Sequence, residues 1–80
     1  MATRITISDV STGYSVDIDV EPWNTIDELL ESVATFWDKD LAAYCLRWET
    51  YLLRGETPIS SLQIAEGVTF EFIQDPEGGA

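Results

Sequence analysis

The chain has 80 residues, of which 45% are apolar, so it can form one compact domain near the lower size limit for an unaided hydrophobic core. Fifteen acidic and four basic residues, with no histidine, give a formal net charge of −11, which disfavours binding to nucleic-acid phosphates or anionic lipid. No apolar run approaches the ~20 residues that span a bilayer, and the single cysteine, Cys45, excludes an internal disulfide framework.

The N-terminal residues 1–4 lack the apolar core of a signal peptide, so we expect a cytoplasmic protein. The excess of acids has two explanations of equal weight. It keeps a small protein soluble, and it complements a basic protein partner. We expect a monomer when the chain is alone, with no membrane or nucleic-acid partner.

Residues 4–21 have the pattern of a β-hairpin. Apolar Ile5 and Ile7 alternate with polar Thr6 and Ser8, and this period of two indicates a half-buried strand. Gly13 closes the following turn, where it can adopt a positive φ. The alternation then resumes, with Val16, Ile18 and Val20 facing inward and Asp17, Asp19 and Glu21 facing outward. The outward acids disfavour edge-to-edge pairing with another sheet.

A helix follows the hairpin. Pro22 ends the second strand because it has no amide to donate to a ladder. Thr25 and Glu28 fit a capping box, in which each side chain accepts a hydrogen bond from the backbone of the other. The next apolar residues recur at helical spacing and form one face about three turns long: Ile26, Leu29, Leu30, Val33, Ala34 and Trp37. We expect this face to pack on the hairpin and to supply most of the core.

The region after the helix has a weaker pattern. Residues 44–48 predict a third strand in which one alternate set faces inward and the other outward. The inward set is Tyr44, Leu46 and Trp48, and the outward set is Cys45 and Arg47.

The remaining chain predicts two more strands. Residues 51–53 form a short strand that leads into a turn at residues 54–55. Three apolar residues on an irregular or 3₁₀ segment are expected to enter the core: Ile59, Leu62 and Ile64. The last strand, residues 68–72, alternates with Val68, Phe70 and Phe72 inward.

The hairpin and the start of the helix resemble ubiquitin in sequence. Thr12-Gly13, Val20-Glu21-Pro22 and Thr25-Ile26 stand at the spacing of the corresponding residues of that family. The resemblance implies an α+β fold of the ubiquitin-like β-grasp type, with a mixed sheet of four to five strands packed on one main helix. It divides the chain into a domain of residues 1–74 and a flexible C-terminal tail of residues 75–80, and it points to a bacterial ubiquitin-like protein.

The resemblance also assigns chemistry to the tail. Members of the family end in a diglycine that an E1-like activating enzyme adenylates with ATP, passes to an E2-like enzyme as a thioester, and transfers to a target amine as an isopeptide bond. Glycine suits this role because a backbone without side chains can thread a narrow channel. By resemblance, Gly79 is the reactive residue and Gly78 its neighbour, and a JAB-type or other processing protease first removes Ala80.

The chain departs from ubiquitin at three places. Asp75, Pro76 and Glu77 precede the diglycine where ubiquitin has arginines, which implies dedicated enzymes. The positions that correspond to the apolar patch through which ubiquitin binds its readers are polar here, namely Ser11, Arg47 and Glu71, so ordinary ubiquitin-binding domains are not expected to recognise the chain. We assign Arg47 and Glu71 to partner binding, together with Asp75, Pro76 and Glu77. Lys39 is the only lysine, so it is the one possible side-chain acceptor for chain formation.

Two alternatives to a conjugated modifier remain. One is a non-covalent β-grasp adaptor of the secretion-system type, whose tail is inert, and the other is a sulfur carrier. No catalytic constellation is present, so we do not expect an enzyme, and we expect no cofactor and no metal site. Cys45 is expected to be structural because no basic residue stands ready to activate it. Trp23, just before the helix, is the aromatic residue expected to be partly exposed for partner contact.

Overall fold

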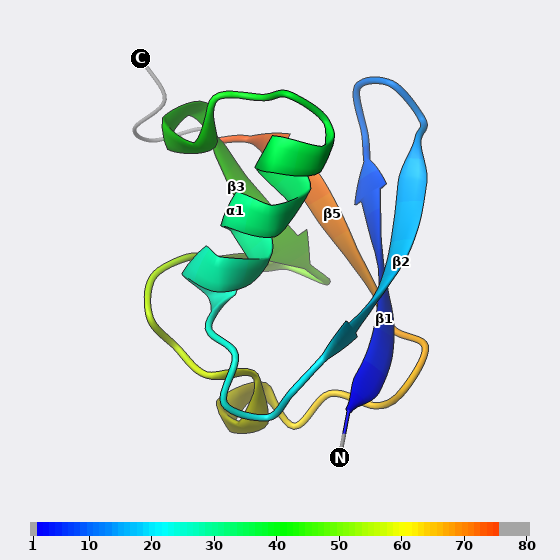
Figure 1. The fold of residues 1–80 in the computed structure, drawn as a ribbon, viewed down its shortest axis with the longest axis vertical. Helices are drawn as coiled ribbons and strands as arrows, with labels where there is room; N and C mark the ends of the chain where they lie inside the picture. The colour runs from blue at the N-terminus through cyan, green and yellow to red at the C-terminus, as the bar shows by residue number, and fades with distance from the viewer. Residues whose placement is uncertain (1, 76–80) are drawn as a thin grey trace.

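The computed structural model describes residues 2–75 and begins with the expected hairpin (Figure 1). Strand β1 (Thr3–Asp9) pairs with β2 (Ser15–Val20) in antiparallel register, with Ile5 opposite Ile18. Gly13 has φ 82° in the connecting loop, as the sequence predicts. Alternation of apolar and polar residues therefore identified both strands and the face that each presents to the core.

Helix α1 (Ile26–Phe36) is the main helix. The capping box is confirmed, since the Thr25 hydroxyl accepts from the Glu28 amide at 3.2 Å and the Glu28 carboxylate accepts from the Thr25 amide at 2.9 Å. Trp37 caps the end of the helix, and its ring meets the edge of Phe72 at a centroid distance of 5.6 Å. The buried residues of α1 belong to the predicted face: Ile26, Leu29, Leu30, Val33 and Ala34.

The second half of the chain contains three strands and two short 3₁₀ helices. The elements are η1 (Leu41–Ala43), β3 (Tyr44–Trp48), β4 (Tyr51–Leu53), η2 (Ile59–Leu62) and β5 (Thr69–Gln74). The sequence predicts the last strand at residues 68–72. The observed strand begins one residue later, and it extends two residues further because its end continues to pair with β3. The inward set of β3 is confirmed, with Tyr44 stacked on Phe72 at 4.5 Å and Trp48 tilted against Phe70 at 6.0 Å.

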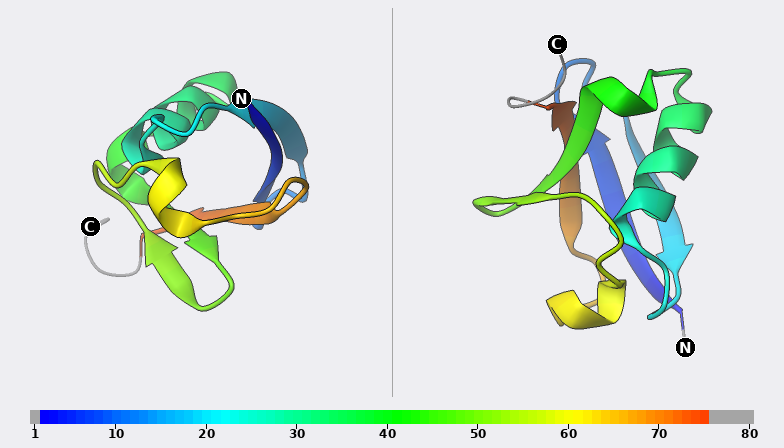
Figure 2. Two further views of the ribbon diagram at one scale, coloured as in Figure 1. Left: turned by 90° about the horizontal axis from the view of Figure 1, so that it is seen from below. Right: turned by 90° about the vertical axis from the view of Figure 1, so that its left-hand side faces the viewer.

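The five strands form one mixed sheet in the order β2-β1-β5-β3-β4. The central pair, β1 and β5, is parallel, and the other pairs are antiparallel. The sheet curves around α1, which covers its inner face (Figure 2). Ile5, Ile7, Leu46, Phe70 and Phe72 are completely buried between the sheet and the helix. This arrangement confirms the predicted α+β architecture.

The outward orientation predicted for Cys45 does not make the residue accessible to solvent. Cys45 lies on the outer face of β3, yet its exposed fraction is 0%. It stands opposite Ile73 of β5 and on the same face as Arg47. Facing away from the helix is therefore not the same as facing solvent in this part of the sheet.

Candidate functional site

The residues assigned to conjugation and processing lie outside the described part of the chain. These are Gly78, Gly79 and Ala80, together with Pro76 and Glu77 of the tail. The structure describes the site as far as Asp75, the residue that follows β5.

Asp75 was assigned to the tail, but it is held against the domain. Its amide donates to the Ala43 carbonyl at 2.9 Å, which extends the pairing beyond the end of β5. Its carboxylate binds the Arg54 guanidinium through two contacts, at 2.9 and 3.1 Å, and its side chain is only 11% exposed. Asp75 is therefore attached to the domain through both its backbone and its side chain. Asp75 is also less available to a partner than a free tail residue would be.

Arg47 and Glu71, two of the residues assigned to partner binding, form an ion pair on the outer face of the sheet. They are directly opposite each other in β3 and β5, and Arg47 Nε lies 2.6 Å from Glu71 Oε1. The hydrogen bond and the charge of Glu71 raise the pKa of Arg47. The pair presents a polar, internally neutralised surface about 40% exposed, so an apolar partner would have to desolvate both charges.

Ser11, the third residue assigned to this surface, does not join the ion pair. It lies in the loop between β1 and β2, where its amide and its hydroxyl both donate to Asp9 Oδ1, at 2.9 and 2.7 Å. The structure therefore brings Arg47 and Glu71 together and turns the Ser11 side chain toward its own loop.

Asp9 is a buried carboxylate that the sequence reasoning missed. Its exposed fraction is 1%, and Oδ2 is buried without a hydrogen-bond partner among residues 2–75. Burial works against the charged form, but hydrogen bonds from Ser11 and the Thr12 amide, together with the charge of Lys39, hold the pKa of Asp9 below its usual value. The signal was present in the sequence, because Asp9 continues the inward series and precedes a serine by two residues, the spacing of an Asx turn.

Lys39, the possible acceptor, lies just after the end of α1. Its amide donates to the Ala34 carbonyl at 2.7 Å, and the residue is half-buried. Its charge is the smallest of the influences that lower the pKa of Asp9.

Trp23 is 69% exposed in the segment between β2 and α1, which confirms the expectation of an accessible aromatic ring. Within residues 2–75, no group of three or more His, Cys, Asp or Glu side chains is arranged to hold a metal ion. The same residues contain no helix long and apolar enough to cross a membrane.

No protein-family model and no curated protein matches this sequence. The structure, in contrast, is similar to several solved structures. The ubiquitin of Caldiarchaeum subterraneum superposes with a TM-score of 0.86 at 22% identity, over 99% of this chain and 100% of that chain. The UBL domain of Dsk2 from Plasmodium falciparum gives a TM-score of 0.83 at 17% identity, over 94% of this chain and 100% of that chain.

A de novo design based on ubiquitin gives a TM-score of 0.82 at 24% identity, over 99% of this chain and 95% of that chain. A natural ubiquitin, a UBL domain and a ubiquitin-based design thus share the sheet order and helix placement of this protein. The identities are low, so the likeness concerns the arrangement of the backbone. The chain has the ubiquitin-like β-grasp fold.

Proposed function

We propose that this protein is a ubiquitin-like modifier that is attached to target proteins through the carboxylate of Gly79 after removal of Ala80. The observation that carries the proposal is the position of Gly78-Gly79 in the sequence, a few residues after the last strand of a ubiquitin-like fold. Gly79 is four residues further along the chain than the anchored Asp75. A fully extended segment of that length reaches at most about 14 Å. Gly79 can therefore enter an active site only if the enzyme also contacts the domain.

The proposed chemistry has five steps. A protease of the JAB or another type adds water across the Gly79–Ala80 peptide bond and frees the Gly79 carboxylate. An E1-like enzyme lets this carboxylate attack the α-phosphorus of ATP, which expels pyrophosphate and leaves an acyl adenylate. A thiolate of the activating enzyme displaces AMP to give a thioester. A thiolate of the E2-like enzyme then attacks this thioester and displaces the first thiolate, so that the E2-like enzyme carries the acyl group. A target amine then displaces the thiolate, forming an isopeptide bond and releasing one proton.

The charges next to the diglycine support a dedicated set of enzymes. Asp75 is paired with Arg54 and mostly buried, so we assign the selection of the enzyme chiefly to Glu77. An enzyme channel that accepts this tail would carry a basic residue opposite Glu77, because an acidic or apolar wall would leave that carboxylate unpaired.

The experiment is a reconstitution with the full chain, ATP, an E1-like activating enzyme and a processing protease. Intact mass spectrometry should show loss of Ala80, followed by adducts linked through Gly79. The variant Gly79→Val should yield neither an adenylate nor an adduct, because a branched side chain blocks the channel. Glu77→Arg should keep the diglycine but lose activation. Retention of Ala80 in the presence of all enzymes, or adducts that form equally well with Gly79→Val, would refute the proposal.

The exposed aromatic and apolar side chains favour a second candidate, a non-covalent adaptor. Trp23, Phe36 and Tyr51 are each more than 60% exposed, which suits contact with a protein partner. For an adaptor, Gly79→Val would leave function intact, whereas Trp23→Ala would reduce partner binding. A sulfur carrier, the third candidate, would differ from a modifier by the appearance of a thiocarboxylate on Gly79 in the intact mass.

A further inference from the structure

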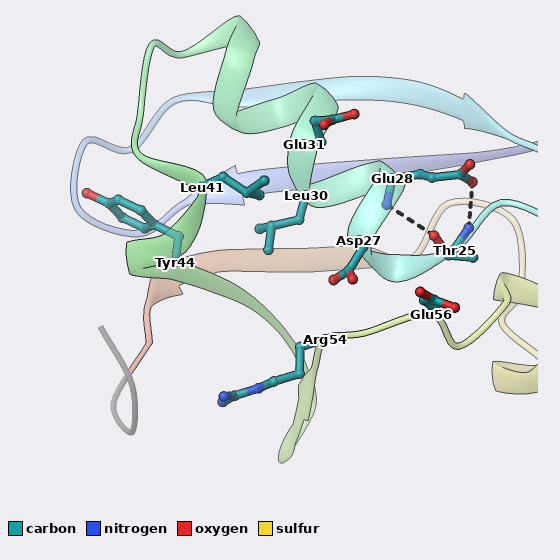
Figure 3. A pocket seen from close by; sticks show the side chains of 9 residues that line it. All are labelled: Thr25, Asp27, Glu28, Leu30, Glu31, Leu41, Tyr44, Arg54 and Glu56. Atoms are coloured by element: carbon teal, nitrogen blue, oxygen red, sulfur yellow. Dashed lines mark hydrogen bonds between the residues drawn. The ribbon is translucent and has the colours of Figure 1, made fainter. Parts of the chain in front are cut away.

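A groove of about 800 Å³ runs between α1 and the segment that follows β4 (Figure 3). Its apolar part is formed by Leu30, by Leu41 of η1 and by Tyr44 at the start of β3. Leu41 is 40% exposed, although it stands next to the buried Leu30 in this lining. The remaining lining is polar or charged: Thr25, Asp27, Glu28, Glu31, Arg54 and Glu56. The groove thus combines an accessible apolar surface with an acidic rim.

Two of the four acids in the lining are already used by the fold. Asp27 accepts from the Gly55 amide at 2.8 Å, and Glu28 belongs to the capping box. The side chains of Glu31 and Glu56 form no hydrogen bond or ion pair with any other residue in the range 2–75. The groove therefore has two negative charges that the domain itself does not neutralise.

Arg54 is the one basic residue in the lining, and its charge is directed elsewhere. Its side chain points away from Asp27 and Glu56 (Figure 3), and its guanidinium holds both carboxylate oxygens of Asp75. The nearest cation is thus already paired, and the acids of the groove remain available to a cation from another molecule.

We propose that this groove docks a basic segment of a partner protein, in which an apolar side chain is flanked by lysine or arginine. The apolar side chain would lie on Leu30, Leu41 and Tyr44, and the flanking cations would pair with Glu31 and Glu56. Charge complementarity determines this choice of occupant. The tail of this chain carries Glu77 and is repelled by the same rim, and the whole protein has a net charge of −11. The docking is non-covalent and does not depend on Gly79.

The test is a titration of the full chain, labelled with ¹⁵N, with the blocked peptide Ac-Lys-Lys-Leu-Lys-Lys-amide. Saturable shifts are expected at the amides of Leu30, Leu41 and Glu56, with little change at Arg47 and Glu71 on the outer face. A peptide with serine in place of leucine has the same charge and should bind at least about fivefold more weakly, because it cannot bury an apolar side chain. Equal binding of the two peptides would contradict the proposal.

Two matched pairs of variants separate the groove from general attraction by net charge. Glu56→Gln should weaken binding roughly two- to fivefold, whereas Glu66→Gln, an exposed acid near Arg4, should not. Arg54→Met should strengthen binding by a similar factor, whereas Arg4→Met should not. Equal effects within each pair, shifts centred on the outer face, or no saturable binding would each overturn the proposal. None of these outcomes bears on conjugation through Gly79.

Discussion

Arg54 holds both carboxylate oxygens of Asp75, with Nη1 2.9 Å from Oδ2 and Nη2 3.1 Å from Oδ1. The two residues are 21 positions apart in sequence. Their pairing holds Asp75 against the domain, next to the hydrogen bond between the Asp75 amide and the Ala43 carbonyl. It also draws the Arg54 charge away from the acidic groove.

Asp75→Asn tests how much this ion pair contributes to stability, because the substitution removes the charge and keeps the size of the side chain. Arg54 is 41% exposed, so water screens the pair, and we expect the free energy of unfolding to fall by only about 0.2–1 kcal/mol. Urea denaturation would measure this loss. Glu66→Gln changes the net charge equally and should leave stability unchanged. If both variants lost the same amount, net charge rather than the pair would be responsible.

Asp9→Asn should change how stability depends on pH. The pKa of Asp9 is lower in the folded protein than its usual value, so the carboxylate adds stability above about pH 4 and loses it as the pH falls through the folded pKa. At pH 7 the variant should therefore be less stable than the wild type by about 1–3 kcal/mol, the range for a lost charged hydrogen bond. Below about pH 4 the difference should shrink.

Urea denaturation of both proteins between pH 7 and pH 3 would test the role of Asp9. Asp38→Asn provides the control, since Asp38 is exposed and asparagine tolerates its positive φ of 56°. A difference between wild type and Asp9→Asn that stays constant down to pH 3 would mean that the Asp9 charge does not contribute in the way the structure indicates.

Leu30→Ala tests the buried face of α1. Leu30 is 4% exposed, and its truncation should cost roughly 2–5 kcal/mol. In a domain of this size the lower figure corresponds to a fall of at least about 8 °C in Tm. Leu41→Ala, at a 40% exposed position of the same groove, should cost less than about 1 kcal/mol. Thermal unfolding followed by circular dichroism would compare the two, and similar costs would contradict the burial of Leu30.

Local sequence patterns predicted the elements of this fold better than their long-range contacts. Thr25 and Glu28 are three residues apart, so their reciprocal capping can be read directly from the chain. The attachment of Asp75 to Arg54 depends on the pairing of β3 with β5, which no local pattern specifies. The groove likewise assembles a helix face, a 3₁₀ turn and a loop from separate parts of the chain.

The burial of Cys45 is another feature that local sequence patterns do not predict, and it provides the last prediction. Alternation of apolar and polar residues places Cys45 on the outer face of the sheet, but it does not predict that the residue is buried, with an exposed fraction of 0%. We expect its thiol to react with Ellman's reagent at least about a hundredfold more slowly in the native protein than in urea, because reaction requires the sheet to open. Ser32→Cys adds an exposed thiol on α1 as an internal control, so the variant should show one fast and one slow reaction. Two fast reactions in native buffer would show that Cys45 is accessible and that β3 and β5 separate readily at this position.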